Sequence, residues 1–251
     1  MKIRFPKMPM REKTTYKSVF DGIENNETHF AVAADIGEYP QKENFENPEL
    51  YIVFPFARIG IASASNDLQR GINTFNDRRF NNNYGWAPDG VQAARLGLPN
   101  AVDVILHHAL RQQQYPYGGW INASSALPYT VSKVPITAAR FITDTPYLDT
   151  TGVNMTAIQE ALLQSHDLAD SEQLLDGGPI RLLPALRKTW SGNFKLRARG
   201  GFLVECAFTN GQVKEIKILS EQGRKLRLIN PWDSKLIERN TQVGEKLTFK
   251  P

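Results

Sequence analysis

Carboxylates and aromatic side chains are the residues of this chain whose types and spacing could carry chemistry. Glu43, Glu46 and Glu49 recur at intervals of three residues, a spacing that brings side chains to one face of a helix. Pro48 prevents one continuous helix through all three. A polar entry into a helix is therefore the simpler interpretation of these glutamates.

A second group combines aromatic rings with glycines. Tyr115, Tyr117 and Trp120, together with Gly118 and Gly119, predict an aromatic loop. The C–H face of a sugar packs well on an aromatic ring, so this loop could bind a glycan. Packing within the loop itself accounts for the pattern equally well.

Asp149 stands in a short polar run just before a predicted helix. An acid at such a position is either a catalytic carboxylate or a helix cap, and the residues alone favour the cap.

Several common chemistries have no signature in the chain. It has no GxGxxG, Walker, GxSxG or HExxH motif, which excludes the usual nucleotide-binding and serine-hydrolase sites. His107 and His108 are adjacent on a predicted helix and point in different directions, so we expect no metal site, and we expect no cofactor. Cys206 is the only cysteine, lies on the apolar face of a predicted strand and cannot form an internal disulfide.

Composition is that of a packed protein. The 251 residues are 41% hydrophobic and 22% charged, which predicts one large domain or two smaller ones. Residues 181–251 are basic, with 15 Lys and Arg against 6 Asp and Glu. These cations are dispersed along predicted strands without interleaved aromatics, so we expect no nucleic-acid partner.

Nothing in the sequence predicts a membrane span, because the apolar runs are far shorter than the roughly 20 residues that a bilayer requires. Residues 1–13 are basic but interrupted by Pro6 and Pro9, and they lack the apolar core of a secretory signal. The sequence itself therefore leaves the localisation unknown.

Helical periodicity dominates the first part of the chain. We expect five helices, at about 48–60, 66–78, 88–97, 100–113 and 153–166. Asn66 is placed to cap the second helix, and the fifth should begin after Gly152. The fourth shows one apolar stripe, formed by Ala101, Val104, Ile105, His108 and Ala109.

The periodicity changes to two after the breaker run Gly177-Gly178-Pro179. Strands are expected at 202–208, 212–219, 224–229 and 246–250, with Asn210-Gly211 in a hairpin turn between the first two. We therefore predict a helical region over 1–176 and a small antiparallel β-sandwich, or a sheet folded onto the helices, over 177–251. Residues 1–45 contain a basic block followed by an acidic block and remain unassigned, with a solvated loop as the simplest interpretation.

One long run resembles a known family. Asp149 to His166, ending Glu160-Ala161-Leu162-Leu163-Gln164-Ser165-His166, is similar to the late catalytic segment of the glycoside hydrolase family 95 α-L-fucosidases. In that family an Asp precedes a helix ending Leu-Leu-Gln-Ser-His, at the same interval.

Further blocks follow in the family's order. Leu50-Tyr51-Ile52-Val53-Phe54-Pro55, Tyr84-Gly85-Trp86 and Ala94-Arg95-Leu96-Gly97 resemble blocks of the catalytic domain. Leu182-Leu183-Pro184-Ala185-Leu186, Trp190 and Leu196-Arg197-Ala198-Arg199-Gly200-Gly201-Phe202 resemble the link to its C-terminal sandwich.

The resemblance implies a mainly α protein with a β C-terminal domain. The family has a six-hairpin (α/α) barrel of twelve helices, so five helices imply a partial barrel. It also implies inverting hydrolysis of terminal α-L-fucosyl or related hexosyl residues and an exported, periplasmic or extracellular location. The partner would be an oligosaccharide or polysaccharide, and a partial barrel would expose apolar helix faces and favour self-association.

Specific roles also come from the resemblance. Asp149 would be the catalytic Asp that makes two water-positioning Asn side chains effective as a base. Glu46 and Glu49 stand where the family has two sugar-pocket His residues, and Trp86 and Trp120 are further substrate-binding candidates. The family's general-acid Glu and its Asn pair have no counterpart in this chain, so we expect it to be incomplete for catalysis alone.

The carry-over has departures. The family's Asp-Gly-Asn-Phe-Gly is replaced by Asp149-Thr150-Thr151-Gly152, which loses the Asn, and the replacement of the two pocket His residues by Glu46 and Glu49 leaves the sugar open. The alternatives are a non-catalytic carbohydrate-binding or structural module, and phosphorolysis on the same fold.

Overall fold

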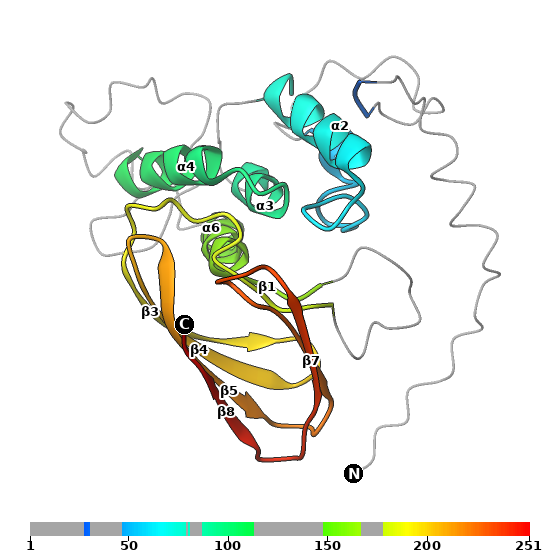
Figure 1. The fold of residues 1–251 in the computed structure, drawn as a ribbon. Helices are drawn as coiled ribbons and strands as arrows, with labels where there is room; N and C mark the ends of the chain where they lie inside the picture. Colours follow the sequence, from blue (N-terminus) through cyan, green and yellow to red (C-terminus); the bar gives the residue numbers. More distant parts are fainter. Residues whose placement is uncertain (1–27, 31–46, 79, 81–86, 113–147, 167–177) are drawn as a thin grey trace, which may run out of the picture.

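The computed structural model describes residues 28–30, 47–78, 80, 87–112, 148–166 and 178–251. Figure 1 shows the helices gathered on one side of the molecule and the strands on the other, with α6 between them. No helix in the described part of the chain is long and apolar enough to cross a bilayer.

In the described part of the chain, three α-helices precede α6. They are α2 (Ser65–Asn76), α3 (Asp89–Arg95) and α4 (Pro99–Gln112), close to the ranges expected from the sequence. Every residue of α3 is buried, because this short helix contacts both α4 and α6 (Leu148–Leu162). Their shared core is built from apolar side chains: Leu50, Val53, Phe75, Val91, Leu96, Val102, Ile105, Leu106, Ala157 and Ala161.

The prediction of a helix at 48–60 was wrong. The chain forms only a 3-10 turn, η2 (Pro48–Leu50), followed by hydrogen-bonded turns. Pro55 has no N–H to donate, so a regular helix cannot continue through it. Leu50 and Val53 are nevertheless fully buried, which explains the helix-like apolar spacing of this segment.

Two expected helix starts were also wrong. Asn66 does not cap α2, because the helix begins one residue earlier at Ser65, with Ala64 in the cap position. Similarly, α6 begins at Leu148, so Gly152 lies inside the helix instead of preceding it. Among the described residues, nothing lies within 4 Å of the position that a Cβ on Gly152 would occupy.

The far end of α6 also differs from the expected 153–166. The helix stops at Leu162, and the next two residues form β1 (Leu163–Gln164), which pairs antiparallel with β2 (Arg181–Leu182). This pairing fastens the end of α6 to the β region.

The buried face of α4 is not the stripe expected from the sequence. Val104 is 63% exposed, whereas Val102 and Leu106 are each 2% exposed and Ile105 is 7% exposed. Among the described residues of the expected stripe, Ile105 is buried and Ala101 is partly buried against the same core, so Val104 is the one that the stripe placed wrongly. The side chains of His108 and Ala109 lie outside the described part of the chain.

The C-terminal region is a β domain, as expected. Its four-stranded antiparallel sheet has the order β3-β4-β5-β8. The bounds are β3 (Gly192–Ala198), β4 (Phe202–Thr209), β5 (Gln212–Ser220) and β8 (Lys246–Phe249). The alternation predicted for β4 is confirmed, since Phe202, Val204, Cys206 and Phe208 are all buried.

The hairpin between β4 and β5 is also confirmed. Asn210 and Gly211 have φ values of 50° and 68°, the left-handed conformation that a two-residue hairpin loop requires. Neither β3 nor β7 (Leu236–Asn240) was among the strands predicted from the sequence. β7 pairs with β6 (Lys225–Ile229).

The β6–β7 ribbon and the four-stranded sheet share one core, which also receives residues from β1 and the segment before β2. Ile180 forms an isolated parallel bridge with Leu228 of β6. The core consists mainly of Leu163, Ile180, Phe202, Val204, Cys206, Ile216, Ile218, Leu226 and Leu228. Closure of these strands into a sandwich, and of the helices into part of a six-hairpin barrel, remain predictions.

A polar contact joins the two regions away from β1. Asp103 of α4 accepts hydrogen bonds from Arg187 Nη1 at 2.6 Å and from Trp190 Nε1 at 3.0 Å. Burial raises the pKa of Asp103, but these bonds outweigh burial and leave the pKa below its ordinary value. The segment before β3 is thereby held against α4.

Candidate functional site

Two of the five site residues expected from the sequence lie in the described part of the chain. Asp149 is in the first turn of α6 and is exposed. Glu49 is in η2 and is half-buried. Glu46, Trp86 and Trp120 lie outside the described residues, so their expected roles remain predictions.

Glu49 lies near a second carboxylate that the sequence interpretation missed. Burial raises the pKa of Glu49, and the negative charge of Asp89 raises it further. Asp89, at the start of α3, is only 1% exposed and forms a close ion pair with Arg78 Nε. Burial raises the pKa of Asp89, while Arg78 acts in the opposite direction.

Hydrogen bonds hold Arg78 and the residue before η2 in place. The Asn47 side chain exchanges two hydrogen bonds with the backbone of Phe80, at 2.8 and 2.9 Å. Arg78 donates to the carbonyl oxygen of Phe75 at 2.6 Å and stacks over its ring at 4.0 Å. The half-buried Glu49 carboxylate could accept hydrogen bonds from sugar hydroxyls.

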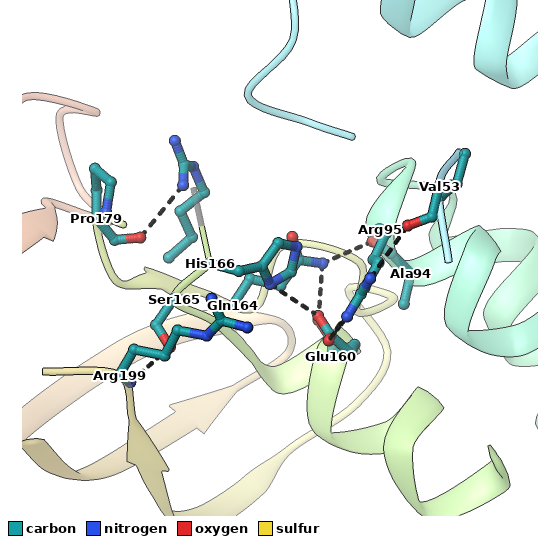
Figure 2. A network of polar contacts seen from close by, with 10 residues as sticks. Val53, Ala94, Arg95, Glu160, Gln164, Ser165, His166, Pro179 and Arg199 are labelled. Atoms are coloured by element: carbon teal, nitrogen blue, oxygen red, sulfur yellow. Dashed lines mark hydrogen bonds and ion pairs between the residues drawn. The ribbon is translucent and has the colours of Figure 1, made fainter. Parts of the chain in front are cut away.

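A second polar cluster lies at the other end of α6. Figure 2 shows Arg95 of α3 facing Glu160 of α6. Arg95 Nε and Nη2 donate to Glu160 Oε1 at 3.2 and 2.9 Å, and Nη1 donates to the carbonyl oxygen of Val53 at 3.1 Å. The guanidinium also lies 4.9 Å from the centre of the Phe54 ring. One side chain therefore connects α3, α6 and the turn after η2.

His166 completes this cluster. Its Nδ1 lies 3.6 Å from Glu160 Oε2, and the side chain is only 9% exposed. Burial, together with the positive charges of Arg95, Arg199 and Arg181, lowers the pKa of His166 to about 3. The ring is therefore neutral at neutral pH, although a carboxylate is close.

The residues between Glu160 and His166 connect the cluster to both cores. Gln164 Nε2 donates to the carbonyl oxygens of Ala94 and Glu160, at 2.8 and 3.0 Å. Ser165 Oγ accepts a hydrogen bond from the Arg199 backbone N–H at 2.9 Å, as Figure 2 shows. These residues thus anchor the end of α6 to α3 on one side and to β3 and its following turn on the other. They are Glu160, Gln164, Ser165 and His166.

These residues border a cavity of about 450 Å³ between the end of α6 and the β3–β4 hairpin. Its lining is rich in polar and cationic side chains: Arg95, Thr156, Gln159, Glu160, Leu163, Ser165, His166, Lys195, Leu196, Arg197, Arg199 and Leu203. Asp149 and Glu49 are absent from this lining.

The sequence interpretation quoted Arg95, Glu160, His166 and Arg199 only as letters of similar blocks. It assigned no role to any of them and did not predict that they meet. The signal that could have found them is that several of the sequence blocks similar to the family contain a charged residue.

Comparison with known families identifies the β domain. Residues 176–249 match the family described as glycoside hydrolase family 95, C-terminal domain. This region is therefore similar to the C-terminal domain of that glycoside hydrolase family, which confirms the C-terminal part of the resemblance noted in the sequence. No curated protein matches the chain.

Proposed function

We propose that this chain is the C-terminal part of a glycoside hydrolase that cleaves terminal α-L-fucosyl or related hexosyl residues with inversion. The match of residues 176–249 to the family 95 C-terminal domain carries this proposal. The helical region 1–176 contributes one wall of the catalytic barrel, and the domain 177–251 supports it.

Physical continuity between the two regions supports this assignment. The helix that bears Asp149 runs directly into β1, which pairs with β2 inside the matched domain. The hydrogen bond between Ser165 and the Arg199 backbone adds a second attachment. The position of Asp149 is therefore coupled rigidly to the domain that the family match identifies.

Asp149 is the catalytic carboxylate in this proposal. Its exposure and its place in the first turn of α6 leave it accessible to substrate and to other polypeptide segments. A carboxylate is favoured there because the helix N-terminus carries partial positive charge. It would orient and polarise amide side chains that hold the attacking water, which together act as the base.

Glu49 forms part of the sugar-binding wall, with Glu46, Trp86 and Trp120 as further members. The half-buried Glu49 carboxylate can accept hydrogen bonds from sugar hydroxyls. The general acid has no counterpart in this sequence, so the chain by itself should turn over substrate very slowly.

A non-catalytic carbohydrate-binding or structural module is the second candidate. One observation favours it, namely that Thr150-Thr151-Gly152 follows Asp149 where the family has Gly-Asn-Phe-Gly. Such a module would bind a fucosyl or galactosyl glycan with no turnover under any condition.

The deciding experiment compares turnover with binding. Release of fucose and galactose from oligosaccharides is measured for the purified chain and for a chimaera that carries the family's upstream catalytic segment ahead of it. We expect little release by the chain alone and clear release by the chimaera. Binding without release by a folded chimaera would favour the non-catalytic module.

A further inference from the structure

The cavity between α6 and the β3–β4 hairpin is positively charged. Four cationic residues line it, Arg95, Lys195, Arg197 and Arg199, while Glu160 is the only acid among its described lining residues. A cavity with this excess of cations favours an anionic ligand.

The four cations are not equally available. Arg95 is engaged by Glu160 and Val53, Lys195 pairs with Glu205 at 2.6 Å, and Arg197 pairs with Glu221 at 3.0 Å. The Arg199 guanidinium, in contrast, forms no hydrogen bond or ion pair with any residue that the structure describes, although its backbone is held by Ser165. Its planar donor fork matches the two oxygens of a carboxylate.

The cavity also offers polar groups suited to hydroxyls. Glu160 Oε2 is buried and has no hydrogen-bond partner among the described residues, since Arg95 contacts only Oε1. His166 lies beside Oε2 as a neutral ring, which has one N–H donor and one acceptor nitrogen. A buried carboxylate oxygen without a partner is costly, and a hydroxyl donor would satisfy it.

We propose that this cavity binds an acidic sugar unit, with the sugar carboxylate on Arg199 and a ring hydroxyl donating to Glu160 Oε2. The choice of a sugar rests on the function proposed above, whereas the choice of an anion rests on the cavity alone. Glu160 follows Asp149 by eleven residues on one helix, about 16 Å along its axis, so this subsite is separate from the catalytic carboxylate.

Calorimetric titration of the full chain with a matched pair of ligands tests the proposal. Methyl β-D-glucuronide and methyl β-D-glucoside share one ring and differ by carboxylate against hydroxymethyl. We expect the glucuronide to bind at least about tenfold more tightly, because only it can form the charge-assisted bonds to Arg199. Equal affinity for the two ligands, or binding of neither, would overturn the proposal.

Arg199→Gln and Lys246→Gln form a matched pair of variants that remove the same charge. Lys246 is an exposed residue of β8 and does not line the cavity. Glucuronide affinity should fall about tenfold in Arg199→Gln and remain within twofold in Lys246→Gln. Equal weakening in both would indicate a general charge effect and would contradict the subsite.

Two controls keep the result interpretable. The exposed Arg199 side chain has no described partner, so Arg199→Gln should retain the melting temperature, and Arg199→Lys should recover part of the affinity. Acetate should bind much more weakly than the glucuronide, and equal affinity would overturn recognition of the sugar ring. None of these measurements uses turnover, so failure of the proposed glycosidase would leave this test intact.

Discussion

Arg95 and Glu160, 65 residues apart in the chain, meet as a nearly buried ion pair in which two guanidinium nitrogens share one carboxylate oxygen, Oε1. The pair joins α3 to α6 directly beside the polar cavity. Both side chains are close to nine-tenths buried, so solvent screens them little.

Replacing one partner of this ion pair should lower the free energy of unfolding more than the loss of the pair as a whole would. Arg95→Met or Glu160→Met alone leaves a buried charge without its partner, and we expect each to lower the free energy of unfolding by about 3–5 kcal/mol. The double variant should be less destabilised than the sum of the two single variants. Urea unfolding of the four proteins measures the coupling energy, and strict additivity would show that the pair is energetically unimportant.

His166 should make the protein less stable in mild acid. Its folded-state pKa of about 3 lies below the ordinary value of 6.5, so between these values the unfolded chain binds a proton that the folded chain does not. Stability should therefore fall as pH falls through this window, by about 2 kcal/mol from pH 7 to pH 5.

The matched variant for this measurement is His166→Asn, which cannot titrate. Glu160 has the opposite effect on stability just above pH 4.5. Its pKa is raised chiefly by burial, so its protonation favours the folded state as pH falls, and this contribution is common to both proteins. The difference in pH dependence between wild type and His166→Asn isolates the histidine. Identical pH profiles would show that the folded-state pKa of His166 lies near its ordinary value.

Two glycines should respond to alanine in opposite ways. Gly152→Ala adds a Cβ that has no described atom within 4 Å, so we expect α6 to gain about 0.5–1 kcal/mol from better helix propensity. Gly90→Ala places its Cβ 2.9 Å from the Ala157 Cβ, and we expect a loss of about 1–3 kcal/mol from overpacking. Thermal melting distinguishes them, and stabilisation by both would show that α3 and α6 can separate.

Asp149→Asn tests the proposed catalytic role in the active chimaera. The substitution preserves shape and removes charge, so kcat should fall by about 10²-fold or more with an unchanged melting temperature. Asp149 lies inside α6, one residue after Leu148, so the capping role considered from the sequence does not apply, and a purely structural Asp149 would only interact favourably with the helix N-terminus. The control is Asp167→Asn, for which no loss of kcat is expected, and full activity of Asp149→Asn would leave only this structural role.

Limited proteolysis tests the domain division at 176 and 177. We expect cleavage to concentrate near 168–180 or in the first 45 residues, where the sequence predicts exposed loops. The β4–β5 pairing protects residues 202–220. Early cleavage inside 200–230 would contradict the division.

Some features were predictable because neighbours in the sequence decide them. The alternation of Phe202, Val204, Cys206 and Phe208 gives β4 its buried face, and Asn210-Gly211 supplies the conformation that its hairpin needs. The predicted start of α6, after Gly152, was wrong because a helix tolerates an isolated glycine at a cost of about 1 kcal/mol.

The amino-acid sequence by itself determined the helical and β regions, the β4–β5 hairpin and the resemblance that the match over residues 176–249 confirms. Tertiary structure decided which face of α4 is buried, because apolar residues occupy both candidate faces and only packing against α3 and α6 selects one. It also decided that Arg95, Glu160, His166 and Arg199 share a single cluster. Their separations in the chain carry no periodic signal, since such contacts depend on how distant elements pack and not on local conformational preference.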